Sequence, residues 1–266
     1  MRNFQHPGRS AVYADQGMCA TSHPLAAQTA ISILKDGGNA VDAAIGAAVL
    51  LGLSEPQRTG IGGDMFALVA QPDGQIIGLN ASGRAPAAFD AEAVRAKHDT
   101  MPLYDVAAIT VPGAIDGFCR LHGDHGALGL DRVLAPAIHY AETGVPIAPR
   151  VAFDYGEAHH VLQGRAKDLF LDAGGPKTVG SRFAAPGQAD VLRRVAALGR
   201  TSFYEGEIAE DMAASLRALG GTHTLDDFAA TACEYVTPLR SPYRDAELLE
   251  LPPNGHGAIA ILMAQM

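Results

Sequence analysis

The sequence predicts an α+β protein with a largely helical middle region. Three observations lead to this prediction. Helical spacing of apolar residues runs through the first 55 positions, two short apolar segments follow at 65–70 and 75–80, and helical spacing dominates from 111 into the 220s. The 266 residues are 48% apolar and only 18% charged, with 30 glycines and 16 prolines, which is typical of a compact, loop-rich globular protein.

A helical hairpin is predicted near the N-terminus. Ser22 is the expected N-cap of its first helix, because proline at position 24 suits a first helical turn. Gly37 is expected to end that helix in the left-handed conformation. Asn39 should then cap a second helix, Ala40–Leu53, whose small side chains allow close packing against neighbours.

Two buried strands are predicted next, at Met65–Ala70 and Gln75–Asn80, joined by a proline- and glycine-containing turn. Both are apolar almost throughout, which indicates burial on both faces of a sheet that lies between two layers. The predicted later helices are 112–122, 131–142, 150–162, 188–198, 205–219 and 225–230. An extended tail follows at 235–251, and an apolar helix begins at Ala258.

The expected domain organisation is one incomplete domain over residues 1–266. Residues 1–110 would supply core helices and strands, 111–230 a mainly helical region, and 231–266 a return to the core. The last predicted helix is still apolar at Met266, and isolated helices of this length are marginal in water. The architecture is therefore expected to be truncated.

Charge and cysteine usage exclude several classes of partner. A net charge of −9 argues against nucleic acid or an anionic membrane as the main partner. Cys19, Cys119 and Cys233 are too widely spaced for a metal site or a disulfide framework, so we expect three reduced, mostly buried thiols. With no signal peptide visible, the expected location is the cytoplasm. We expect no metal and no cofactor.

The glycine loop at Gly60, Gly62 and Gly63 is the first candidate site. A phosphate cradle places such glycines after a strand and before a helix, often with a lysine. Here the predicted order is helix, loop, strand, and no lysine follows, so phosphate and dinucleotide binding are disfavoured. The loop suits a place where the backbone approaches another group closely, and an active-site wall fits that description equally well.

The segment 79–86, LNASGRAP, is the second candidate site. A guanidinium on such a loop, here Arg84, can hold a carboxylate through two parallel hydrogen bonds. On the residues alone, a solvated arginine at a turn is the favoured alternative. Thr224 resembles a nucleophile beside His223, but the acidic residues after it favour a helix cap. The histidine pair at 159–160 is a poor metal site, because its side chains point in different directions.

Several stretches together resemble the γ-glutamyltransferase family of N-terminal-nucleophile hydrolases. They appear in the family's order along essentially the whole chain, and GGNAVDAA at 37–44 is the most distinctive. The others include GMCATSHPLA at 17–26, TGIGGDMF at 59–66, VPG at 111–113, FYEG at 203–206, GGTHTLDD at 220–227 and LPPNG at 251–255. So many ordered motifs make a chance resemblance untenable.

The resemblance implies the large-subunit portion of such an enzyme, with part of a four-layer αββα core. In this family a precursor cleaves itself, and the newly exposed threonine of the small subunit attacks the amide with its own α-amine as general base. The oxyanion-stabilising glycines also belong to the small subunit. This chain ends before both, so no catalytic residue is expected in it.

The substrate implied by the resemblance differs from glutathione. Family members that act on glutathione carry an arginine three positions before the Ala-Pro pair, where this chain has Ser82 and its arginine is Arg84. The form is closest to the branch with oxamate amidohydrolases and related acylases. The candidate substrate-binding residues are therefore Arg84, Ser82, Gly62 and Gly63, and Arg84 is expected to bind a substrate carboxylate.

Two functions remain open from the sequence. The first is the large-subunit part of an enzyme that cleaves or transfers an acyl group from a γ-glutamyl or related anionic amide. Its expected partners are a small-molecule amide and a small subunit carrying the nucleophile, in an assembly that allows a homodimer of heterodimers. The alternative is a non-catalytic truncated remnant or binding protein. Sequence downstream of Met266 would discriminate between them.

Overall fold

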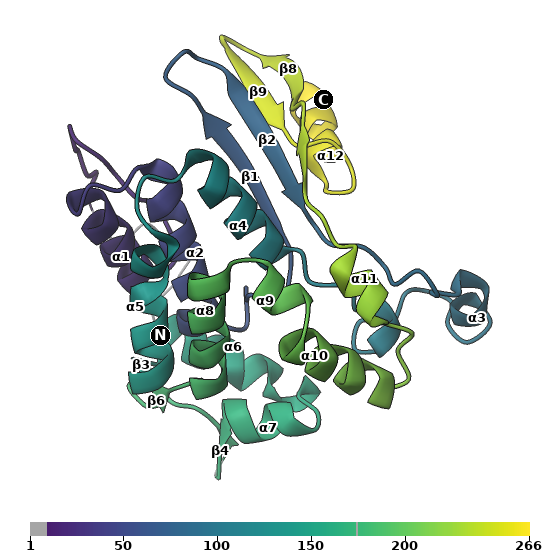
Figure 1. The fold of residues 1–266 in the computed structure, drawn as a ribbon. Helices are drawn as coiled ribbons and strands as arrows, with labels where there is room; N and C mark the ends of the chain where they lie inside the picture. Colours follow the sequence, from purple (N-terminus) through teal and green to yellow (C-terminus); the bar gives the residue numbers. More distant parts are fainter. Residues whose placement is uncertain (1–9, 174) are drawn as a thin grey trace. The chain divides into compact units, whose positions relative to one another are not determined.

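The computed structural model describes residues 10–173 and 175–266, which form two compact units (Figure 1). The first unit comprises the chain up to Gly60 together with residues 126–197. The second comprises residues 61–125 and 198–266. Helices and short antiparallel strands occur in both units, which confirms the predicted α+β class.

The first unit is built on the predicted helical hairpin. Helix α1 spans Pro24–Lys35, α2 spans Ala40–Ser54, and α5, at Leu130–Thr143, packs beside α2. A Cβ atom at Gly46 would lie 2.3 Å from Cδ1 of Ile33 and 3.1 Å from the carbonyl oxygen of Val133. Glycine at this position therefore lets α1 and α5 approach α2 closely, as the small side chains predicted.

The caps of the hairpin confirm one prediction and correct another. Asn39 caps α2, and Asp42 completes a capping box by accepting from the Asn39 backbone N–H at 3.0 Å. The N-cap of α1 is His23, whose Nδ1 accepts from the Leu25 N–H. The prediction of Ser22 was wrong because the Ser22 hydroxyl donates to Glu55, 33 residues away, a contact that local sequence does not reveal.

The remainder of the first unit is short helices and two-residue strands. In chain order these are β3 Val145–Pro146, α6 Pro149–Ala158, the 3₁₀ helix η2 His159–Val161, α7 Arg165–Phe170, β4 Leu171–Asp172, β5 Gly175–Pro176, β6 Arg182–Phe183 and α8 Pro186–Leu198. Strand β3 pairs with β6, and β4 pairs with β5.

A three-stranded antiparallel sheet organises the second unit, in the order β1-β2-β7. Its strands are β1 Met65–Ala70, β2 Ile76–Ala81 and β7 Glu234–Val236. Helix α4, Ala114–His125, packs on β1 and β2, where a Cβ atom at Gly117 would lie 2.5 Å from that of Ala81 (Figure 1). The absence of a side chain at Gly117 thus allows the helix to pack directly on the sheet.

The prediction that β1 is buried on both faces of the sheet was wrong. Its residues alternate between partly buried and exposed, and Phe66 and Leu68 remain 41% and 42% exposed. The alternation follows from the period of two along a strand, since every second side chain points away from the face on which α4 packs. Strand β2, by contrast, has only partly buried and buried residues.

The other elements of the second unit comprise the predicted helices and extended tail, together with short helices at 91–95, 106–108 and 201–204 that were not predicted. They are α3 Ala91–Arg95, the 3₁₀ helix η1 Val106–Ala108, α9 Thr201–Tyr204, α10 Glu207–Ala218, α11 Leu225–Ala229, β8 Leu239–Tyr243, β9 Ala246–Glu250 and α12 Gly257–Gln265. Strands β8 and β9 form a hairpin against which α12 packs (Figure 1). Thr224 caps α11 in a capping box with Asp227, which confirms it as a cap. Among the described residues, no helix is long and apolar enough to span a membrane.

Candidate functional site

The loop that follows β2 carries the predicted binding residues Ser82 and Arg84, and it is held at two further points. The backbone N–H of Val111 donates to the Arg84 carbonyl oxygen at 2.9 Å. The backbone N–H of Ala87 donates to the Asp227 carboxylate at 2.8 Å. These bonds hold the loop at the Arg84 carbonyl and three residues after it, while the Arg84 side chain is itself exposed.

Two glycines allow this loop to touch the segment that leads into α4. Gly83 has φ of +77°, and a Cβ atom there would lie 2.0 Å from the Val111 carbonyl oxygen. A Cβ atom at Gly113 would lie 2.3 Å from the Ala81 carbonyl oxygen. Only glycine at both positions permits this backbone-to-backbone contact, because any side chain would overlap the facing chain.

The predicted glycine loop meets the same segment. The Gly63 carbonyl oxygen accepts from the backbone N–H groups of Gly113 and Ala114, at 2.9 and 3.0 Å. These amides at the start of α4 are the groups that would otherwise be free to bind an anion. Gly63 therefore makes the close backbone contact, whereas nothing lies within 4 Å of a Cβ atom built on Gly60 or on exposed Gly62.

Asn254 is a site residue that sequence reasoning did not single out. Its side-chain amide donates to the Ser82 hydroxyl, and its carbonyl oxygen accepts from the Asn80 amide at 3.0 Å. Asn80 in turn accepts from the Ser82 backbone N–H at 3.1 Å. The available signal was the turn 251–255, in which an uncharged amide follows two prolines.

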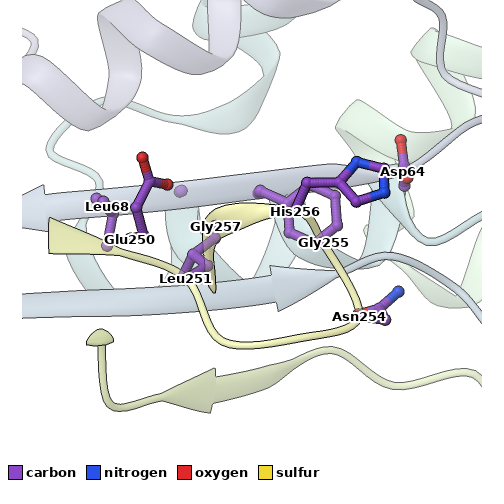
Figure 2. Close-up of a pocket in the computed structure, with 10 residues that line it drawn as sticks. Asp64, Leu68, Glu250, Leu251, Asn254, Gly255, His256 and Gly257 are labelled. Carbon is purple, nitrogen blue, oxygen red and sulfur yellow. The ribbon is translucent and has the colours of Figure 1, made fainter. Parts of the chain in front are cut away.

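A cavity of about 600 Å³ adjoins these residues within the second unit (Figure 2). Its walls come from β1 and from the turn between β9 and α12. The lining residues are Asp64, Phe66, Ala67, Leu68, Glu250, Leu251, Asn254, Gly255, His256 and Gly257. Figure 2 shows Glu250 near one end of the pocket and His256 with Asp64 near the other.

The four predicted site residues differ in how close they lie to this cavity. Ser82 is linked to it through Asn254, and Gly62 and Gly63 directly precede its wall residue Asp64. Arg84 does not line it. Within the described part of the chain, the Arg84 side chain has no hydrogen-bond or ion-pair partner, which leaves its five donors available to a ligand.

The Asp227 carboxyl is kept ionised by the hydrogen bonds that it accepts from the loop and from Thr224. Burial alone would raise the pKa of this carboxyl, but hydrogen bonds from the Ala87 backbone and from Thr224 hold the pKa below its ordinary value. Asp227 therefore stays ionised at neutral pH and accepts hydrogen bonds from both sides. It joins the cap of α11 to the candidate site.

The chemistry available here is binding and orientation. The Ser82 hydroxyl donates to the neighbouring Gly83 carbonyl oxygen at 3.2 Å, so it is not aimed at a base that could activate it as a nucleophile. In residues 10–173 and 175–266, no group of three or more His, Cys, Asp or Glu side chains could hold a metal ion. The three cysteines are free thiols, as expected, but each is only partly buried.

Comparison with known proteins agrees with the ordered motifs. The gamma-glutamyltranspeptidase family model matches residues 26–266. The chain is 34% identical over 261 residues to the oxamate amidohydrolase proenzyme of Klebsiella pneumoniae, covering 95% of this chain and 49% of that protein. It is 33% identical over 256 residues to the glutathione hydrolase-like YwrD proenzyme of Bacillus subtilis, with the same two coverages. The chain thus spans about half the length of these curated relatives.

Solved structures support the same fold. The cephalosporin acylase of Bacillus halodurans superposes with a TM-score of 0.89 at 41% identity, covering 97% of this chain and 50% of that one. The gamma-glutamyltranspeptidase of Helicobacter pylori superposes with a TM-score of 0.85 at 27% identity, covering 93% of this chain and 73% of that one. These likenesses confirm the predicted family resemblance and its fold.

Proposed function

The chain belongs to the gamma-glutamyltranspeptidase family, and from this premise we propose that it is the large-subunit part of an enzyme that cleaves or transfers an acyl group from an amide. The observation that carries the proposal is the family match over residues 26–266. The proposed nucleophile is the N-terminal threonine of a small subunit outside these residues. The role of this chain is to form core elements and one wall of the substrate pocket.

The proposed substrate is a small anionic amide, a γ-glutamyl compound or a related one. Arg84 is the proposed partner of its carboxylate, because its guanidinium is exposed on a loop that is held at the Arg84 carbonyl and at the Ala87 N–H. Ser82 stands where an arginine would be expected for glutathione. This supports a substrate nearer to those of the relatives named oxamate amidohydrolase and cephalosporin acylase.

The proposed partner is a small subunit produced from the same polypeptide. Two relatives are proenzymes by name, which supports processing of a longer precursor. A homodimer of such heterodimers and a cytoplasmic location complete the proposal. Size-exclusion chromatography with light scattering and cell fractionation test these two parts separately.

The test of function uses the complete polypeptide that carries this chain. Intact mass should show self-cleavage into two subunits, and the product should hydrolyse one of oxamate, a glutaryl amide or a γ-glutamyl anilide. The 266-residue chain alone should hydrolyse none of them. Turnover by that pure chain would contradict the missing nucleophile, whereas an uncleaved and inactive complete polypeptide would favour the non-catalytic alternative.

The role of Arg84 is tested by Arg84→Ala in the same polypeptide. Loss of charge-assisted hydrogen bonds should raise KM for the anionic amide at least about tenfold, and leave a neutral amide of the same acyl length unaffected. Arg95→Ala is the matched control, since Arg95 is exposed on α3 and pairs with Glu92 on the same helix. An unchanged KM in Arg84→Ala would exclude Arg84 from carboxylate binding.

A further inference from the structure

We propose that Tyr204 is a positioning residue that holds the two candidate-site loops in register through the segment 111–113, and that Asp116 and Arg200 support it. The kinetic part of this inference rests on the proposed function, and the structural part does not. The motifs VPG at 111–113 and FYEG at 203–206, which the substrate pocket does not explain, meet at this point.

The Tyr204 hydroxyl is buried, and it both donates and accepts a hydrogen bond. It donates to the Pro112 carbonyl oxygen at 2.7 Å and accepts from the Asp116 backbone N–H at 3.0 Å, while the residue is only 1% exposed. Pro112 has no N–H, so its carbonyl is its one backbone hydrogen-bonding group. The single hydroxyl therefore ties the segment before α4 to the first turn of that helix.

Pro112 lies between the two residues that contact the site loops. On one side, the Val111 N–H donates to the Arg84 carbonyl oxygen. On the other, the Gly113 N–H donates to the Gly63 carbonyl oxygen. A shift of the Pro112 carbonyl would move both donors, and with them the loop of Arg84 and the loop that leads to Asp64.

An ion pair beneath the tyrosine keeps this arrangement rigid. One oxygen of the Asp116 carboxylate accepts from the Arg200 guanidinium, and the other accepts from the Cys233 backbone N–H at 2.6 Å. Arg200 also donates to the Thr231 carbonyl oxygen, and its Cζ lies 4.8 Å from the centre of the Tyr204 ring. Asp116 is 5% exposed, so the bonds that its carboxylate accepts act with little competition from water.

The variant Tyr204→Phe in the complete polypeptide removes the hydroxyl alone. It leaves the Pro112 carbonyl and the Asp116 N–H unpaired, so the two loops should lose their common register. The groups displaced are proposed to bind substrate rather than to react with it, so substrate binding should change more than turnover. The expected result is a rise of about fivefold in KM for the anionic amide, with kcat changed less than twofold.

Hydrogen–deuterium exchange supplies a readout that does not depend on activity. The backbone amides of Val111, Gly113 and Ala114 should exchange at least about tenfold faster in Tyr204→Phe, with helix α10 unchanged. Tyr155→Phe is the matched control, because Tyr155 is also buried and its hydroxyl has no hydrogen-bond partner in the described chain. That variant should alter neither KM nor exchange at 111–114.

The outcomes separate this inference from the proposed function. Faster exchange confined to 111–114 supports positioning even if no amide is hydrolysed by the wild-type protein. Unchanged exchange at these amides would overturn the inference, whatever the activity. Faster exchange throughout the second unit with KM unchanged would also overturn it, because that pattern reports a role in overall stability alone.

Discussion

Asn254 donates a hydrogen bond to the hydroxyl of Ser82, although 172 residues separate them in the chain. Asn254 also accepts from Asn80 and lines the cavity beside β1, so the three polar side chains join the end of β2 to the turn before α12. Ser82 is thereby incorporated into a neutral hydrogen-bonded cluster. The Ser82 hydroxyl is thus held by Asn254, a residue that lines the cavity.

Asn254→Ala should weaken substrate binding without abolishing turnover. Loss of two neutral hydrogen bonds, each contributing about 0.5–1.5 kcal/mol, should raise KM at least about fivefold in the complete polypeptide. Steady-state kinetics on the preferred amide measures this effect. Gln75→Ala, an exposed amide in the same unit, is the control and should leave KM unchanged. An unchanged KM in Asn254→Ala would show that the position of Ser82 does not affect substrate binding.

Gly83→Ala should destabilise the fold, while Gly62→Ala should not. Alanine at 83 would combine a left-handed backbone with a Cβ atom 2.0 Å from the Val111 carbonyl oxygen, costing more than about 2 kcal/mol of unfolding free energy. Gly62 faces open space, so the change there should stay within about 0.5 kcal/mol. Denaturant midpoints of the two variants measure the difference, and equal midpoints would contradict the close approach at Gly83.

Asp227 should make the second unit sensitive to acid. Its folded-state pKa lies below the ordinary value of 3.8, so its contribution to stability is present above that value and is lost as pH falls through the lower folded pKa. Asp227→Asn should therefore lower the melting temperature at pH 7, and the gap to wild type should close below about pH 4. Asp226→Asn, at the exposed neighbour, serves as control. A gap that persists unchanged at pH 3 would rule out this linkage.

Cys119 and Cys233 should react slowly with alkylating reagents in the folded protein. Burial, together with the Asp116 carboxylate, raises the pKa of Cys119 to about 11 and that of Cys233 to about 12. Because the thiolate is the reactive form, alkylation at pH 8 should be roughly 100-fold slower than in urea. Peptide mass spectrometry after timed iodoacetamide treatment gives both rates. Native rates within tenfold of the unfolded ones would refute the expectation.

Features set by neighbouring residues could be predicted from the sequence. The N-caps Asn39 and Thr224 and the glycine that ends α1 were all predicted correctly, because each depends on residues within a few positions. The cap of α1 was missed, since the Ser22 hydroxyl is engaged by distant Glu55. Exposure of alternate residues on β1 was missed because apolar composition does not reveal which face a helix covers.

By itself, the sequence determined the α+β class, the order of the main helices and strands, and membership of the family, since these follow from periodicity, local capping and ordered motifs. Tertiary structure alone decided which distant groups meet. It placed Asn254 within hydrogen-bonding distance of Ser82, and the Tyr204 hydroxyl within hydrogen-bonding distance of the Pro112 carbonyl oxygen. It also left the Arg84 guanidinium exposed on an anchored loop. Such contacts join residues about 90 to 170 positions apart, and they form only when the folded chain brings both partners within hydrogen-bonding distance.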